Sequence, residues 1–211
     1  MEQLRALPPD AELPVGFTIA ELLDKLTPPP APPGSVFRLD PDRLAAAGGS
    51  AGGQLSAMAA LTPGRFEGSG GHADQRSEVQ AIVLWYPVVD MRLAGRTDES
   101  AQPITRFLGD PTDDRALVAS PIAYVSRACP PVLTISGDAD PVSILAHNQA
   151  FHAALDAHGA SNRLEVFEAG HGFDVSPAYW DRSFELLADF LDEHLPVARP
   201  AQSGTGSAPP V

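Results

Sequence analysis

Three residues that can together perform acyl transfer occur in the order Ser50, Asp140 and His171. A serine hydroxyl becomes a nucleophile when a histidine accepts its proton, and a carboxylate orients that histidine. Ser50 lies in Gly48-Gly49-Ser50-Ala51-Gly52, a G-x-S-x-G pattern that sets the serine on a sharp turn between a strand and a helix. The residue types and their order predict a serine hydrolase.

The glycines around Ser50 are expected to let the strand and the helix pass at close range. For this reason we expect that the positions two residues before and after Ser50, Gly48 and Gly52, cannot accommodate a side chain. The following helix aims the N–H of Ala51 at the oxyanion of an acyl intermediate. A Gly-rich chain produces this pattern by chance, but here an apolar run, 44–47, precedes it and a helix-compatible run, 51–61, follows. The glycines expected to pack this turn are Gly48, Gly49, Gly52 and Gly53.

The acid and the base each follow a predicted strand. Asp140 comes shortly after the apolar run 132–136, and His171 comes shortly after 164–167. Both residues are therefore expected at the carboxyl edge of a sheet, where Ser50 also lies. Asp138 is an alternative acid, and whichever aspartate is not the acid is expected to cap a turn. For His171 the alternative is an ordinary surface loop residue.

The remaining pattern alternates strands and helices. Residues 79–86 form a continuous β-prone run that ends at a proline, and 143–158 and 179–195 are predicted helices. The last of these places four apolar residues at helical spacing: Trp180, Phe184, Leu187 and Leu191. Strands this apolar, separated by helices, predict an α/β fold with a mainly parallel sheet covered on both faces.

Composition divides the chain into three parts. Residues 1–35 are proline-rich and contain a polyproline-type stretch, 36–196 form the predicted α/β domain, and 197–211 form a predicted disordered tail of small residues. The segment between 90 and 118 is polar and is expected to arch over the site as a small lid. The weakest site prediction is a substrate pocket, for which ordinary core packing is an equal alternative; its residues are Trp85, Tyr86, Met91 and Phe107.

The net charge of −13, without any basic stripe, disfavours nucleic acid and anionic membranes as partners. Cys129 is the only cysteine, so we expect neither an internal disulfide nor a zinc site, and the predicted chemistry uses no metal or organic cofactor. Residues 1–18 show no signal-peptide pattern, and no run approaches the ~20 apolar residues of a membrane span. We therefore expect a cytoplasmic protein. A homo-oligomer is possible on the same composition.

Several blocks of the sequence resemble one branch of the α/β-hydrolases. The segments 40–55, 119–125, 130–142 and 170–173 resemble successive motifs of the esterase/lipase branch. They look most like carboxylesterases grouped with the bacterial feruloyl-esterase-like (BD-FAE) proteins and, more distantly, hormone-sensitive-lipase-like esterases. The resemblance implies hydrolysis of a small-molecule carboxylic ester through an acyl-enzyme, with Ser50 as nucleophile, Asp140 as acid and His171 as base.

The chain departs from this family pattern ahead of Ser50. Family members place four strands and a His-Gly-Gly loop there, which supplies half of the oxyanion hole. Here 49 residues precede Ser50, and the sequence contains no His-Gly-Gly. We therefore expect a partial α/β-hydrolase fold with one sheet edge unpaired. One alternative is a truncated, catalytically impaired remnant or binding module. The other is a peptidase of the prolyl-oligopeptidase type. Ala51 disfavours the peptidase, because those enzymes commonly have an aromatic residue at that position.

Overall fold

The computed structural model describes residues 40–66, 76–92 and 114–196. These residues belong to one compact unit, which begins at Asp40. Its centre is a parallel sheet with the order β1-β2-β3-β4, and in the described part of the chain β1 pairs with β2 alone. The strands are β1 (Ala45–Gly49), β2 (Ala81–Trp85), β3 (Val132–Gly137) and β4 (Asn162–Phe167). The predicted α/β class with a parallel sheet is confirmed.

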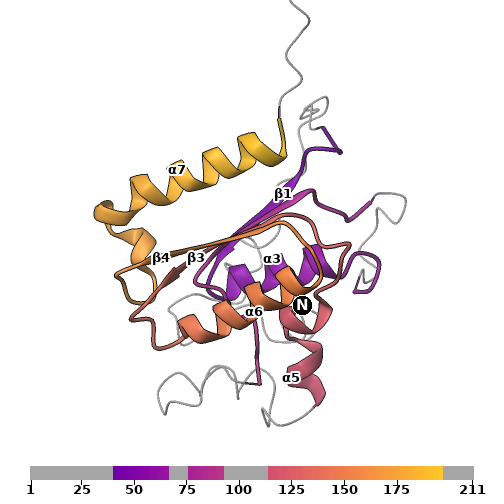
Figure 1. Ribbon diagram of the computed structural model, residues 1–211, viewed down its shortest axis with the longest axis horizontal. Helices are drawn as coiled ribbons and strands as arrows, with labels where there is room; N and C mark the ends of the chain where they lie inside the picture. Colours follow the sequence, from indigo (N-terminus) through magenta and orange to yellow (C-terminus); the bar gives the residue numbers. More distant parts are fainter. Residues whose placement is uncertain (1–39, 67–75, 93–113, 197–211) are drawn as a thin grey trace, which may run out of the picture. The chain divides into compact units, whose positions relative to one another are not determined.

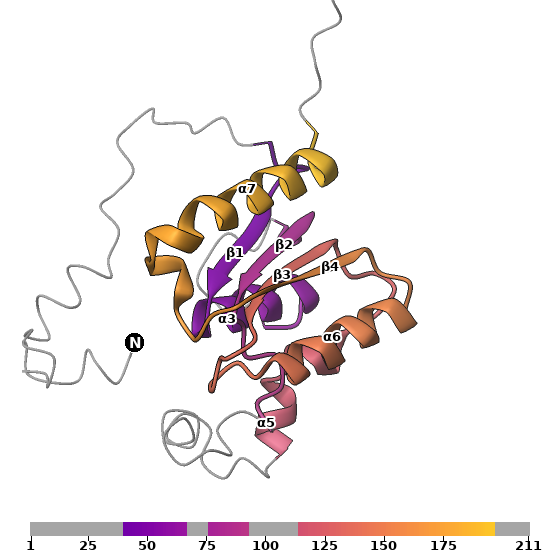
Figure 2. The same cartoon turned by 60° about the vertical axis from the view of Figure 1, so that its left-hand side comes forward.

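Helices cover both faces of this sheet (Figures 1 and 2). Helices α3 (Ala51–Leu61) and α6 (Leu145–Ala157) pack on one face, and α7 (Pro177–His194) packs on the other. Three short elements were not predicted: α5 (Asp114–Val118) and the 3-10 turns η1 (Pro121–Tyr124) and η2 (Phe173–Val175). None of the helices in these three ranges of the chain has the length and apolar character needed to span a bilayer.

Strand β2 shows why the sheet needs cover on both sides. All five of its residues are buried, because the strand lies between β1 and β3. Ile82 and Leu84 belong to the cluster under α3 and α6, whereas Val83 and Trp85 belong to the cluster under α7. Successive side chains of a strand point to opposite faces, so a strand with no polar residue requires two apolar layers.

The face that α7 turns toward the sheet only partly matches the stripe that the sequence suggests, because Leu187 and Leu191 pack against the core while Trp180 and Phe184 do not. Leu186 and Phe190 are almost fully buried on β2 and β3, whereas Trp180 and Phe184 remain 48% and 41% exposed. The two stripes are adjacent on the helix surface, and both have helical spacing. Periodicity therefore identifies the helix, while packing against the sheet decides which stripe is buried.

Several predictions fall on residues that the structure does not describe. These are the proline-rich segment 1–35, most of the predicted lid, the predicted tail 197–211 and the pocket residue Phe107. The structure neither supports nor contradicts them. They stay predictions from the sequence.

Two phenylalanines of α7 test the observed packing. Phe190→Ala should lower the free energy of unfolding by about 3–5 kcal/mol, because it empties a fully buried site. Phe184→Ala, the matched control in the same helix, should cost about 1 kcal/mol or less, because its side chain is 41% exposed. Urea unfolding followed by circular dichroism measures both values, and equal losses would contradict the assignment of the buried face.

Candidate active site

Ser50 occupies a strained position between β1 and α3. Its φ of 53° and ψ of −119° lie outside the regions that non-glycine residues prefer. The backbone N–H of Ser50 donates to the carbonyl oxygen of Trp85 at 2.9 Å, and its own carbonyl accepts from Gln54 at 3.0 Å. One bond fixes the turn to β2 and the other begins helix α3, so the serine is held from both sides.

The glycines of the turn have unequal roles. A Cβ on Gly48 would lie 2.5 Å from the carbonyl carbon and oxygen of Gly52, and a Cβ on Gly53 would lie 2.9 Å from the carbonyl oxygen of Gly48. At Gly52 itself a Cβ would meet nothing within 4 Å, because this residue is exposed. The expectation that Gly52 must lack a side chain is therefore wrong: the close approach is from Gly48 to the backbone around 52–53.

The other two predicted residues meet Ser50 through a continuous line of hydrogen bonds. His171 Nε2 lies 2.8 Å from Ser50 Oγ, and His171 Nδ1 lies 2.8 Å from Asp140 Oδ2. Asp140 is 5% exposed, and its Oδ1 also accepts the N–H groups of Val142 and Ser143 at 2.7 and 2.8 Å. A carboxylate at Nδ1 requires a proton there, which leaves Nε2 to accept the hydroxyl proton of Ser50.

Asp138, the alternative acid, has a different set of contacts. Its side chain accepts the N–H of Ala169 at 3.2 Å, and its own N–H donates to Phe167 at 3.0 Å. A Cβ on Gly137 would lie 2.2 Å from the carbonyl oxygen of Ala169, so the loops after β3 and β4 are in backbone contact. Asp138 thus joins these two loops, and this contact sets Asp140 opposite His171.

A buried polar network supports the loop that carries Asp140. Ser143 Oγ donates to the carbonyl oxygen of Pro87 at 2.6 Å, and the side-chain amide of Asn148 donates to the hydroxyls of Ser143 and Ser136 at 2.9 Å each. All three polar side chains are buried. This network could not be predicted from the sequence, because a lone serine or asparagine in an apolar element gives no signal of its partner.

Tyr86 contacts His171 from the side of β2. Its ring packs edge-on against His171, with 4.7 Å between the ring centroids, and its hydroxyl donates to the carboxylate of Asp174. Burial, followed by this hydrogen bond, raises the pKa of the Tyr86 hydroxyl far above its ordinary value. Asp174, three residues after His171, was not predicted as part of the site.

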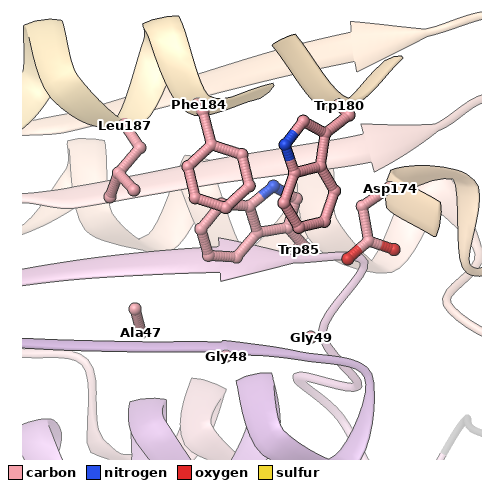
Figure 3. Close-up of a pocket in the computed structure, with 8 residues that line it drawn as sticks. All are labelled: Ala47, Gly48, Gly49, Trp85, Asp174, Trp180, Phe184 and Leu187. Carbon is pink, nitrogen blue, oxygen red and sulfur yellow. The ribbon is translucent and has the colours of Figure 1, made fainter. Parts of the chain in front are cut away.

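Beside the turn lies an open groove of about 370 Å³ (Figure 3). The aromatic rings of Trp85, Trp180 and Phe184 gather along one side of it, and Asp174 lies at one end. The remaining lining residues are Ala47, Gly48, Gly49 and Leu187. Among the predicted pocket residues, Trp85 lines this groove, whereas Met91 lies in a separate buried cluster.

Ala51 is the first residue of α3, and the N–H groups of the first helical turn have no carbonyl acceptor within the helix. It lies next to Ser50 at the positive end of the helix dipole.

Within the residues described, no three His, Cys, Asp or Glu side chains are grouped so that they could hold a metal ion.

The sequence and the fold resemble those of known proteins. The BD-FAE family model matches residues 34–155, more than half of the chain. The chain belongs to the BD-FAE family. This BD-FAE protein is 34% identical to "Esterase LipQ" of Mycobacterium tuberculosis over 72% of its own length and 38% of LipQ. It is 32% identical to "Probable carboxylic ester hydrolase LipM" of the same organism over 75% of its length and 36% of LipM. The chain therefore spans less than two fifths of these relatives.

Solved structures give the same fold. The "Truncated form of carbohydrate esterase from gut microbiota" superposes with a TM-score of 0.67 and 29% identity, over 75% of this BD-FAE chain and 61% of the other. Esterase 2 of Thermogutta terrifontis with bound propionate superposes with a TM-score of 0.61 and 27% identity, over 76% and 60% of the two chains. These neighbours establish the α/β-hydrolase fold for this BD-FAE protein.

Two glycine substitutions test the geometry of the turn in this BD-FAE protein. Gly48→Ala should lower the free energy of unfolding by about 1–3 kcal/mol, because its methyl group meets backbone atoms that cannot move independently. Gly52→Ala should stabilise the protein by about 0.5–1 kcal/mol, because it adds a better helix former in open space. Chemical denaturation measures both, and a destabilised Gly52→Ala would contradict the open space at that position.

Proposed function

We propose that this chain hydrolyses carboxylic esters through an acyl-enzyme formed on Ser50. The observation that carries the proposal is the unbroken hydrogen-bond line from Asp140 through His171 to Ser50, with both links at 2.8 Å. An arrangement of this type activates a serine for attack on a carbonyl carbon. The names of its relatives LipQ and LipM support ester hydrolysis as the reaction.

Each step follows from the positions of the three side chains. His171 Nε2 accepts the hydroxyl proton as Ser50 Oγ bonds to the ester carbonyl carbon, and the carboxylate of Asp140 stabilises the resulting imidazolium. His171 then returns the proton to the alkoxy oxygen, and the alcohol leaves. A water molecule, deprotonated by the same Nε2, attacks the acyl-enzyme, and the acid departs as Ser50 regains its proton.

The negative charge that develops on the carbonyl oxygen needs a donor near Ser50. The N–H of Ala51 serves in this role, aided by the dipole of α3. A single donor of this kind contributes roughly 10²–10³ in turnover. In the family the second donor comes from the chain ahead of the serine turn, and residues 1–39 lie outside the described structure.

The groove beside the turn is the proposed site for the apolar part of the ester. Its position next to Gly48 and Gly49 places it beside the nucleophile, and Trp85 is the predicted pocket residue that lines it. A volume of about 370 Å³ suits a small ligand. The Thermogutta esterase is described with bound propionate and with bound butyrate, which supports short acyl groups for this chain.

The two alternatives drawn from the sequence gain no support. The relatives described above are named as esterases or as an ester hydrolase, none as a peptidase. A catalytically impaired remnant would share the fold and the hydrogen bonds, so the proposal is decided by measured turnover.

Removing the nucleophile is the first test. Ser50→Ala should reduce hydrolysis of p-nitrophenyl acetate and butyrate by at least about 10³-fold. Ser126→Ala, the control, removes an exposed hydroxyl from a turn outside the site and should leave the rate unchanged. A fluorophosphonate probe should add its mass to the wild-type chain and not to Ser50→Ala. Equal near-background rates in the wild-type protein and in Ser50→Ala would refute the proposal.

A second pair of variants decides between the two aspartates. Asp140→Asn should lower kcat by about 10³–10⁴-fold, because an amide at this position favours the wrong histidine tautomer. Asp138→Asn preserves the shape and retains an oxygen for the N–H of Ala169, so it should change kcat less than about fivefold. A larger loss in Asp138→Asn than in Asp140→Asn would reverse the assignment of the acid.

A further inference from the structure

Tyr86 shares a backbone feature with the nucleophile. Among the described residues, only Ser50 and Tyr86 have a positive φ without being glycine, and the φ of Tyr86 is 37°. The residue is 93% buried directly after β2, and its N–H donates to the carbonyl oxygen of Ile135 at 2.8 Å. Strained residues held in this way concentrate at functional sites, so the strain at Tyr86 indicates a role beyond filling the core.

The hydroxyl of Tyr86 connects two segments that are distant in sequence. It donates to Asp174, which lies on the same short turn as His171. Gly172, the first of the two residues between them, has a left-handed φ of 73°. Phe173 packs edge-on against the Tyr86 ring at 5.1 Å between centroids. One side chain thus fixes both ends of the turn that presents the base.

The imidazole of His171 has polar partners only at its two nitrogens, Asp140 at one and Ser50 at the other. Hydrogen bonds at Nδ1 and Nε2 fix two atoms of the ring, and the remaining tilt of the ring comes from rotation about the Cα–Cβ and Cβ–Cγ bonds of His171. The Tyr86 ring, 4.7 Å away at an interplanar angle of 63°, restricts this tilt.

We propose that Tyr86, anchored by Asp174, is a positioning residue that holds the His171 imidazole in the plane needed for proton transfer with Ser50. The inference rests on the proposed function of His171 as the base. Tyr86 acts through His171 and takes no proton itself. Burial and Asp174 both keep its hydroxyl protonated, as the raised pKa indicates.

The test is a double-mutant cycle of Tyr86→Phe and Asp174→Ala, with Tyr124→Phe as the control. Tyr124 also donates its hydroxyl to a single acceptor, the carbonyl oxygen of Val118, and this bond lies outside the site. We expect kcat to fall roughly 10- to 100-fold in each single variant, with KM changing less than about threefold. The double variant should be no slower than the slower single variant, because both changes break the same link. Multiplicative losses, or an unchanged kcat in Tyr86→Phe, would overturn the proposal.

A second measurement does not depend on turnover. The chain has three tyrosines, so 3-fluorotyrosine labelling gives three ¹⁹F resonances, of which Tyr86→Phe removes one. The Tyr86 resonance should move in Asp174→Ala, through loss of its acceptor, and in His171→Gln, through loss of the ring contact. If the wild-type chain shows no Ser50-dependent hydrolysis, the proposed function fails while these shifts still report the link. A resonance that stays in place in either variant would overturn the positioning role.

Discussion

A row of three backbone hydrogen bonds along the carboxyl edge of the sheet determines the geometry of the site. Ser50 donates to the last residue of β2 at 2.9 Å, Tyr86 donates to β3 at 2.8 Å, and the residue after β3 donates to the last residue of β4 at 3.0 Å. Each strand end is thereby fixed to its neighbour at the point where the chain leaves the sheet. Ser50, Asp140 and His171, the proposed nucleophile, acid and base, follow β1, β3 and β4, so their relative positions depend on this row.

The row also explains how the site sustains two strained residues. A non-glycine residue at positive φ costs about 1–3 kcal/mol, and Ser50 and Tyr86 both have this conformation. Each is held by an N–H bond to the adjacent strand and by a neighbouring apolar core. The packing of the buried sheet compensates the strain at these two residues, because β2 and β3 have no exposed residue. As a consequence, the turn has no room for a side chain at Gly48, whose Cβ would lie 2.5 Å from backbone atoms of Gly52.

Much of the fold, and the meeting of Ser50, Asp140 and His171, could be predicted from the sequence, because local patterns encode them. Apolar runs mark the strands, and the order of Ser50, Asp140 and His171 matches the loops that follow them. What could not be predicted depends on contacts between distant segments: the link from Tyr86 to Asp174 joins residues 88 positions apart. The same limit explains the buried face of α7, which periodicity leaves open between two adjacent stripes.

The contrast between Asp138 and Asp140 shows how position, more than residue type, divides these roles. Both follow β3, yet Asp140 is buried beneath two backbone N–H donors and the imidazole, whereas Asp138 accepts a single N–H from the next loop. Buried polar atoms need hydrogen-bond partners, and both carboxylate oxygens of Asp140 have them. The N–H groups of Val142 and Ser143 fix one carboxylate oxygen of Asp140, and the other oxygen faces His171 Nδ1 at 2.8 Å. Asp138 joins the loops after β3 and β4 and thereby keeps Asp140 and His171 within hydrogen-bond distance of each other.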